Sequence, residues 1–227
     1  MRQDASMTAP CVVIAGGHGQ IARHMIELCA DRGIDAVALI RNPAHTDEVT
    51  AWGARPLVLD LEQASESEVA DALSGATAIV FAAGAGPGSG AARKDTVDRG
   101  AAVLLAAAAE SAGVRRFVQI SSFGAGEAVP ASADENWAAY IAAKTAAEVD
   151  LRARDGLDWT ILRPGRLTDD DPSGLVTLSA GQIPKGDVSR ADVAAVIIAL
   201  LDSPGTKGTT LMLTAGDSSI AEAVKAL

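Results

Sequence analysis

The sequence predicts an α/β fold with helices on both faces of a doubly wound parallel sheet. Short runs rich in Val, Ile and Leu alternate with longer amphipathic or alanine-rich segments almost to the C-terminus. This alternation is the pattern of repeated strand–helix units over a parallel sheet. Gly33, Gly75, Gly113 and Gly156 each follow a helical segment, where glycine ends a helix at least cost. We therefore expect one domain over residues 8–227 and a tail over residues 1–7.

The individual elements follow from these runs in chain order. The expected strands are the apolar runs at residues 11–15, 36–40, 56–59, 78–82, 116–120, 159–162 and 210–213. The expected helices are the intervening segments at residues 20–31, 46–52, 65–73, 96–112, 135–155 and 190–201. Residues 164–187 are the exception, because they are rich in Gly, Pro, Asp and Ser and show no long periodicity. They follow the sixth strand at the carboxyl edge of the sheet, so we expect a loop region that covers a substrate there.

Composition excludes several classes of function. The net charge of −10 without a basic run argues against nucleic acid or an anionic membrane as a partner. The two cysteines lack metal-ligand spacing, and Asp169, Asp170 and Asp171 form a solvated acidic run, so no metal site is expected. The apolar stretches are shorter than the roughly 20 residues of a membrane span, and residues 1–10 resemble no signal peptide. We expect a cytoplasmic protein that acts on a small molecule, and its oligomeric state stays open.

A glycine loop follows the first strand in the pattern Gly16-x-x-Gly19-x-x-Ala22. Gly16 permits the tight turn, Gly19 lets the backbone approach a pyrophosphate, and Ala22 lets the helix pack close to the strand. The amides at the helix N-terminus attract the phosphates. A tight turn without any ligand is the alternative explanation, and His18 is expected to be a loop residue and not a catalyst. The loop residues assigned to the dinucleotide are Gly16, His18, Gly19, Gln20 and Ile21.

The ends of the next strands indicate which dinucleotide binds. An NAD-specific site normally places an acid after the second strand, but this chain has Arg41. A guanidinium can pair with a 2′-phosphate, so we expect NADP, with NAD less favoured and an ordinary exposed arginine as the alternative. Asp60, followed by Leu61, stands where it could accept a hydrogen bond from the adenine amino group or cap a helix. The small residues Ala82, Ala83 and Gly84 offer a backbone against which a cofactor ring could lie.

The only tyrosine, Tyr140, stands four residues before Lys144 in a predicted helix. Residues four apart share one face of a helix, so the ammonium group can lie near the phenol and favour loss of its proton. This pair is a candidate general acid and base.

Together these motifs resemble the short-chain dehydrogenase/reductase superfamily, and most closely its atypical, extended-type branch of NAD(P)-binding, NAD-dependent epimerase/dehydratase-like proteins. The resemblance also rests on residues 98–101, 113–122 and 157–165 and covers nearly the whole chain. It implies a Rossmann fold in which Ser122 binds the substrate oxygen, with Ser121 as the second choice. It further implies that Tyr140 exchanges a proton and that Lys144 holds the nicotinamide ribose. It places Arg163, Pro164 and Gly165 at the nicotinamide end and counts Ser121 among the cofactor-binding residues.

The sequence also departs from the family's sugar-nucleotide enzymes. Phe123 follows the serine pair where dehydratases carry acidic residues, and residues 165–187 are too few for a sugar-nucleotide subdomain. The leading prediction is therefore an NADP(H)-dependent oxidoreductase acting on a small carbonyl, quinone or similar acceptor. A non-catalytic NADP(H)-sensing protein and an NAD(P)-dependent epimerase/dehydratase-like enzyme are the alternatives.

Overall fold

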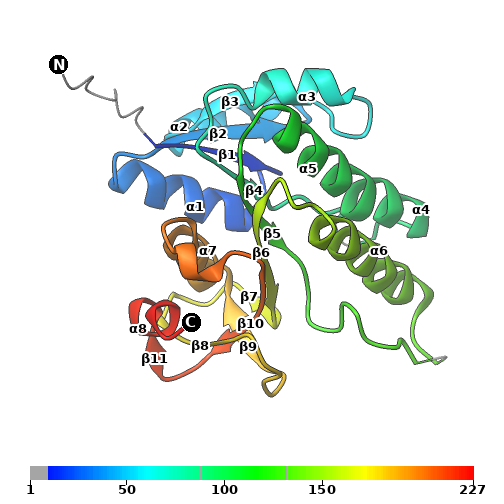
Figure 1. The fold of residues 1–227 in the computed structure, drawn as a ribbon, viewed down its shortest axis with the longest axis vertical. Helices are drawn as coiled ribbons and strands as arrows, with labels where there is room; N and C mark the ends of the chain where they lie inside the picture. The colour runs from blue at the N-terminus through cyan, green and yellow to red at the C-terminus, as the bar shows by residue number, and fades with distance from the viewer. Residues whose placement is uncertain (1–9, 87, 131) are drawn as a thin grey trace.

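The computed structural model describes residues 10–86, 88–130 and 132–227 and confirms the predicted α/β class. The predicted tail over residues 1–7 lies outside the described residues, as do the first two residues of the predicted domain. A large sheet runs through the molecule with helices on both of its faces (Figure 1). Within the described residues, no helix is long and apolar enough to span a membrane.

The strands begin and end close to the predicted positions, with several additions in the C-terminal third. They are β1 (Cys11–Ala15), β2 (Asp35–Ile40), β3 (Arg55–Val58), β4 (Ala78–Phe81), β5 (Arg116–Ile120), β6 (Asp158–Pro164), β7 (Arg166–Thr168), β8 (Leu175–Ser179), β9 (Asp187–Ser189), β10 (Thr209–Ala215) and β11 (Ser218–Ser219). Nine of them form one sheet in the order β11-β8-β10-β6-β5-β4-β1-β2-β3, and β7 pairs with β9 separately. Strands β1 to β6 and β10 are parallel, whereas β8 is antiparallel to both of its neighbours.

The order of the sheet creates a crevice between β1 and β4. From β1 the chain moves outward to β2 and β3, then returns to β4 on the other side of β1 and moves outward again to β5 and β6. In doubly wound folds, ligands bind at such a reversal, beyond the carboxyl ends of the strands. The loops that follow β1 and β4 are therefore the first place to look for a site.

Helices cover the two faces of the sheet in two groups. The helical segments are α1 (Gln20–Asp31), η1 (Pro43–His45), α2 (Thr46–Ala51), α3 (Glu66–Ala72), α4 (Ala91–Arg93), the π-helical η2 (Lys94–Ala101), α5 (Ala102–Ser111), α6 (Glu135–Arg152), α7 (Arg190–Leu201), η3 (Pro204–Thr206) and α8 (Ile220–Lys225). Helices α1 and α7 lie together on one face, and α3, α5 and α6 lie on the other (Figure 1).

The core consists of two apolar clusters, one on each face, and the period of the strands explains the division. Successive side chains of a strand point to opposite faces. In β1, Val12 and Ile14 join the cluster that includes α1 and α7, whereas Val13 and Ala15 join the cluster that includes α5. A strand buried on both faces has no room for polar alternation, which is why this run reads as continuously apolar in the sequence.

Residues 164–187 differ from the predicted loop region, since they contain β7, β8 and the first residue of β9. Strand β8 pairs with β10 and thereby extends the main sheet. The run from Leu175 to Ser179 is short and lies between turn-rich stretches, so the composition of the segment did not indicate a strand. The predicted helix at residues 96–112 is also more complex, because it starts at Ala91 and passes through the π-helical segment before α5.

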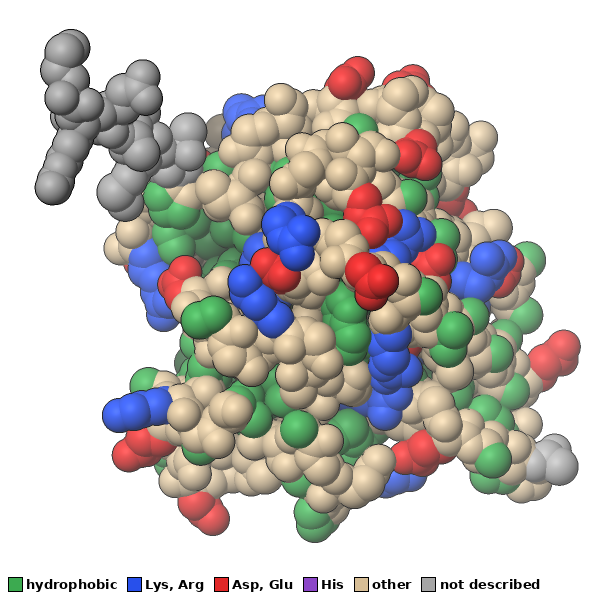
Figure 2. Space-filling model, in the orientation of Figure 1, with side chains coloured by type: hydrophobic (Ala, Val, Ile, Leu, Met, Phe, Trp, Pro, Cys, Tyr) green, Lys and Arg blue, Asp and Glu red, His purple; other side chains and the backbone are tan. Residues whose placement is uncertain are grey.

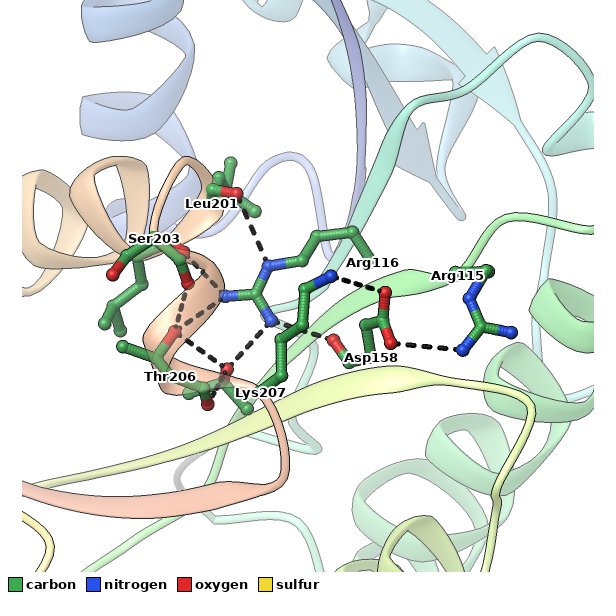
Figure 3. A network of polar contacts seen from close by, with 9 residues as sticks. Arg115, Arg116, Asp158, Leu201, Ser203, Thr206 and Lys207 are labelled. Carbon is green, nitrogen blue, oxygen red and sulfur yellow. Dashed lines mark hydrogen bonds and ion pairs between the residues drawn. The ribbon is translucent and has the colours of Figure 1, made fainter. Parts of the chain in front are cut away.

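At the amino end of the strands, a buried arginine joins the sheet to α7 (Figure 3). Arg116 of β5 donates to the carbonyl oxygens of Leu200 and Leu201 at 2.6 and 3.4 Å. It also donates to the carbonyl oxygen of Asp158, to Thr160 Oγ1 and to Thr206 Oγ1 at 2.8, 2.8 and 3.2 Å. The guanidinium thereby donates to carbonyls of the last turn of α7, where intrahelical donors run out.

Candidate active site

The glycine loop closes the crevice from the side of β1. Gly16 has φ of +82°, and a Cβ atom there would lie 2.6 Å from Ala83 Cα in the loop after β4. Both the backbone angle and the close approach of the two loops therefore require glycine. A Cβ at Gly17 would lie 2.5 Å from Ala38 Cβ on β2. These two glycines let the loop after β1 pack closely against the loop after β4 and against strand β2.

Gly19 differs from the two preceding glycines, because among the described residues a side chain there would meet a single close neighbour and no strained backbone angle. Its φ of −72° is open to any residue, and a Cβ would approach only the Gly16 carbonyl oxygen, at 3.2 Å. Gly19 precedes α1, whose first turn carries no acidic residue and whose N-terminus receives no side-chain cap. An uncapped helix N-terminus beside an open backbone fits a phosphate group.

The crevice is a cavity of about 360 Å³, which we call the dinucleotide cavity. Its lining combines the glycine loop with the residues that follow β2, β3 and β4. Nine of the residues predicted to bind the cofactor line it: Gly16, His18, Gly19, Arg41, Asp60, Leu61, Ala82, Ala83 and Gly84. Gln20 and Ile21, at the start of α1, are outside this lining.

His18 forms part of the wall of the dinucleotide cavity through contacts with the segment after β2. Its ring stacks on His45 with centroids 3.5 Å apart, and its Nε2 lies 3.0 Å from Glu48 Oε2. This hydrogen bond holds the pKa of Glu48 below its usual range. Asp60 uses its Oδ1 to accept a hydrogen bond from the Glu62 amide at 3.0 Å, and α3 is capped by Ser65 instead. The helix-cap alternative for Asp60 is therefore wrong.

A second cavity, of about 850 Å³, lies beyond the ends of β5 and β6, and we call it the substrate cavity. It contains five predicted site residues: Ser121, Ser122, Tyr140, Pro164 and Gly165. Its aromatic side chains are Phe123, Trp137 and Tyr140, with the last two rings 5.5 Å apart. Both ends of the predicted covering segment, residues 164–167 and Lys185, also line it.

Lys144 lies behind Tyr140 and lines neither cavity. Its Nζ lies 5.7 Å from the centroid of the Tyr140 ring, as the spacing on α6 predicted. The ammonium donates to the Ile120 carbonyl oxygen at 3.2 Å and lies 3.2 Å from Asp98 Oδ1. Both charged side chains are buried, and a buried pair of this kind has a fixed position. Asp98 comes from the π-helical η2, a type of segment that recurs at functional sites.

Ser121 and Ser122 are adjacent, but the structure gives them different partners. The Ser121 hydroxyl donates at 2.6 Å to Oε1 of Glu148, which is fully buried on α6. Glu148 also accepts bonds from Arg163 Nε at 2.8 Å and Arg152 Nη2 at 2.7 Å. Among the described residues, the Ser122 hydroxyl makes only a 3.2 Å bond to the carbonyl oxygen of Phe123. The geometry therefore favours Ser122 over Ser121 as the hydroxyl that is free to meet a ligand.

Tyr140, Lys144 and Glu148 are spaced at i, i+4 and i+8 and therefore lie on one face of α6. Lys144 connects this face to η2, and Glu148 connects it to β6. These two buried connections fix the position of the helix that carries the tyrosine. Sequence reasoning found the first two members and missed the third, although the same spacing could have revealed it.

Other site residues were missed because their roles depend on the fold. Lys94 is the first residue of η2, and its Nζ lies 5.3 Å from the centroid of the Tyr140 ring. Glu62 and Arg93 line the dinucleotide cavity together with Arg41. No local pattern marks these residues, since strands and helices far apart in the chain bring them together. Among the described residues, no group of three or more His, Cys, Asp or Glu side chains could hold a metal ion.

The fold and the crevice define a protein that binds a nicotinamide dinucleotide, and comparison with known proteins agrees. The sequence profile of the NAD(P)H-binding family matches residues 16–204. The chain belongs to this family, within the short-chain dehydrogenase/reductase superfamily.

Three similar proteins cover nearly the whole chain. The uncharacterized sugar epimerase YhfK of Bacillus subtilis is 36% identical over 221 residues, which are 95% of this chain and 99% of the relative. A Bacillus halodurans structure, provisionally named NAD-dependent epimerase/dehydratase, is 33% identical with a TM-score of 0.88 and covers 96% of this chain and 100% of its own. The anaerobillin reductase ChuY of Escherichia coli O157:H7 is 28% identical with a TM-score of 0.75, and the match covers 92% of this chain and 98% of that one.

Proposed function

We propose that the protein is an NADP(H)-dependent oxidoreductase that reduces or oxidises a small carbonyl, quinone or similar acceptor. The observation that carries the proposal is the arrangement around Tyr140. Its ring lines the substrate cavity together with Ser122, and the Lys144 ammonium lies 5.7 Å from it. The similarity to a reductase over most of the chain supports reduction as the direction of the chemistry.

Each of these side chains has a distinct task in the proposed reaction. Bound NADP(H) would supply or accept the hydride. Ser122 would hydrogen-bond the substrate oxygen and orient it toward Tyr140, whose phenol would give or take the proton at that oxygen. Lys144, held by Asp98 and the Ile120 carbonyl, would keep a positive charge beside the phenol. This task requires that α6 does not move, and its two buried connections provide this.

Arg41 supports NADP over NAD as the cofactor. It follows β2 directly, and its side chain, 53% exposed, lines the dinucleotide cavity. In doubly wound folds this is the place of the ribose 2′ position. A guanidinium there favours a phosphate over a hydroxyl, because it pairs with phosphate oxygens by charge-assisted hydrogen bonds.

The lining of the substrate cavity indicates the kind of acceptor. Phe123 and Trp137 offer flat apolar surfaces, which suit a planar conjugated molecule. Arg166, Lys185 and Arg190 bring basic groups to the other wall. The two arginines pair with acidic side chains outside the lining. Glu127 also lines the cavity, so a comparison of acceptors with and without a negative charge shows whether the basic groups select a charged one.

Turnover of NADPH with a panel of quinones, flavins and aldehydes tests the proposal. The panel should contain each quinone with and without a carboxylate. The Tyr140→Phe variant should lower kcat at least ~100-fold for carbonyl acceptors, because it removes the proton donor, and should leave NADPH affinity nearly unchanged. Trp137→Phe is the matched control, since it alters the same cavity without removing a hydroxyl and should change KM more than kcat.

The outcomes separate the alternatives. Full activity in Tyr140→Phe would reject the proton-transfer role, although quinone or flavin reduction by direct hydride transfer would survive. If the wild-type protein binds NADPH but reduces no acceptor, and NADPH changes its conformation or partner binding, a cofactor sensor explains it better. Interconversion of sugar epimers without net NADPH oxidation would favour the epimerase alternative.

A further inference from the structure

A single carboxylate oxygen joins two arginines at the outer end of the dinucleotide cavity. Glu62 Oε2 accepts hydrogen bonds from Arg41 Nη1 at 3.1 Å and from Arg93 Nη2 at 2.8 Å. The second oxygen, Oε1, accepts a bond from the Thr96 hydroxyl at 2.7 Å. Both guanidinium groups can therefore reach one oxygen anion at the same point in space. All three charged residues line the dinucleotide cavity.

These residues come from separate parts of the fold. Arg41 follows β2, Glu62 follows β3, and Arg93 ends α4 beyond the loop after β4. The arginine side chains are 53% and 40% exposed, whereas Glu62 is 18% exposed. The arginines can thus turn toward a ligand from two walls of the cavity. Glu62 lies between them and fills the position that an anion would take.

The charges at this cluster are finely balanced. Hydrogen bonds from Arg93 and Thr96 hold the pKa of Glu62 below its usual range, so its carboxylate is ionised at neutral pH. The two arginines and Glu62 together carry a net charge of +1, and Asp60 adds a further negative charge near Arg93. A phosphate would gain charge-assisted bonds from both guanidinium groups, but it would be repelled by the carboxylate that already holds them.

We propose that Arg93 joins Arg41 in binding the 2′-phosphate of NADP(H), and that Glu62 competes with this phosphate for both guanidinium groups. The inference rests on the proposed NADP(H) dependence. If Glu62 competes in this way, the protein carries a built-in weak competitor of the 2′-phosphate. Glu62 lowers the affinity for NADP(H) without touching the affinity for NAD(H), and it thereby eases release of the spent cofactor.

Titration calorimetry with NADPH and NADH tests both parts of the proposal. Arg93→Ala should weaken NADPH binding roughly tenfold, as Arg41→Ala should, because each removes a charge-assisted bond. NADH binding should change less than about twofold, since it has no 2′-phosphate. Glu62→Gln keeps the size of the side chain and removes the charge, so it should strengthen NADPH binding about threefold or more and leave NADH binding unchanged.

Arg99→Ala is the matched control, because Arg99 is also half-exposed and paired with an acid, Asp95, but does not line the cavity. It should change neither affinity. Equal losses of NADPH and NADH binding in Arg93→Ala, or no loss of either, would overturn the role of Arg93. Weaker NADPH binding in Glu62→Gln would overturn the proposed competition and show instead that Glu62 positions the two arginines for the phosphate.

A failure of the proposed cofactor preference has a different signature. In that case the wild-type protein would bind NADH as tightly as NADPH, and Arg41→Ala would change neither affinity. If Arg41→Ala selectively weakens NADPH binding but Arg93→Ala does not, the preference stands and only the inference fails. Circular dichroism and thermal melting of each variant confirm that the affinities refer to folded protein.

Discussion

Arg116 at the amino end of the strands and the pair of Arg41 and Arg93 at the carboxyl end are held in different ways. Arg116 is 9% exposed and donates five hydrogen bonds to oxygens of the protein. Burial lowers its pKa to about 10, so it stays charged at neutral pH. Arg41 and Arg93 are about half exposed and share one carboxylate beside a cavity.

The difference shows how to tell a structural arginine from one that is available to a ligand. The partners of Arg116 are mostly backbone oxygens and hydroxyls of elements packed around it, as Figure 3 shows. A ligand could not replace these partners without unfolding the contact between β5 and α7. The partner of Arg41 and Arg93 is a side chain, which can turn away. Exchangeable partners beside an open cavity are the feature that marks the carboxyl end as the functional one.

The surface as a whole does not reveal this distinction. On the face shown in Figure 2, basic and acidic side chains are interspersed, and no extended basic patch stands out. The site is therefore recognised from its cavities and contacts and not from a concentration of charge.

The largest expected effect concerns Gly19 of the glycine loop. Gly19→Val should weaken binding of both NADPH and NADH at least ~100-fold, because its side chain would fill the place of the pyrophosphate. The variant should fold, since Gly19 has φ of −72° and, among the described residues, an added Cβ would approach only the Gly16 carbonyl oxygen, at 3.2 Å, which a small shift of the loop relieves. Calorimetry measures the binding, and circular dichroism measures the fold. A folded Gly19→Val protein that binds NADPH normally would refute the phosphate-cradle assignment.

Gly16→Ala is the counterpart of that variant within the same loop. A methyl group there would approach the Ala83 backbone to 2.6 Å at a φ of +82°. We expect a loss of stability of about 1–3 kcal/mol, seen as a lower melting temperature. If Gly16→Ala were as stable as the wild-type protein, the assignment of a structural role to Gly16 and a ligand-binding role to Gly19 would be wrong.

Replacement of Arg116, at the amino end of the strands, should clearly reduce stability but have a smaller effect on NADPH binding. Arg116→Met should lower the free energy of unfolding by about 2–3 kcal/mol, because it leaves buried carbonyls and hydroxyls without a donor. Removal of a buried charge offsets part of the loss. NADPH affinity should stay within about twofold of wild type. Chemical denaturation followed by fluorescence measures the first quantity, and calorimetry measures the second.

Arg115→Met is the control for that experiment. Arg115 is the neighbouring residue, 59% exposed, and it pairs with Asp158 at 3.1 Å on the surface. Its replacement should change stability by less than about 0.5 kcal/mol. If Arg115→Met and Arg116→Met lost similar amounts of stability, the contrast between the buried, fully hydrogen-bonded arginine and the exposed one would be wrong.

Local patterns in the sequence predicted the parts of the site that are local in the chain. The glycine loop and the spacing of Tyr140 and Lys144 are set by one turn and one helix, so their residue types carry the information. The positions of β1 to β6 along the chain also followed from alternating runs, because a parallel sheet needs a crossover between each pair of strands. These elements begin and end within a few residues of the predicted positions.

The rest of the site depends on distances between segments that no local pattern encodes. Glu62 and Arg93 are 31 residues apart and meet only because of the order of the sheet. The partner of the Ser121 hydroxyl is Glu148, 27 residues away, and that contact distinguishes Ser121 from the neighbouring Ser122, although both line the same cavity. Strand β8 was hidden for a similar reason, since its antiparallel pairing with β10 defines it.

The central claim is that the carboxyl end of the sheet transfers a hydride between NADPH and an acceptor held beside Tyr140. The most direct measurement uses NADPH that carries deuterium on one face of nicotinamide C4, with mass spectrometry of the product. With deuterium on one of the two faces, the account predicts NADP⁺ that has lost it and an aldehyde product that carries it at the former carbonyl carbon. With deuterium on the other face, NADP⁺ retains it. Hydroquinones and reduced flavins exchange the transferred deuterium with water, so for these acceptors the deuterium content of NADP⁺ is the readout. Bound NADPH that loses deuterium from neither face with any acceptor of the panel would contradict the account.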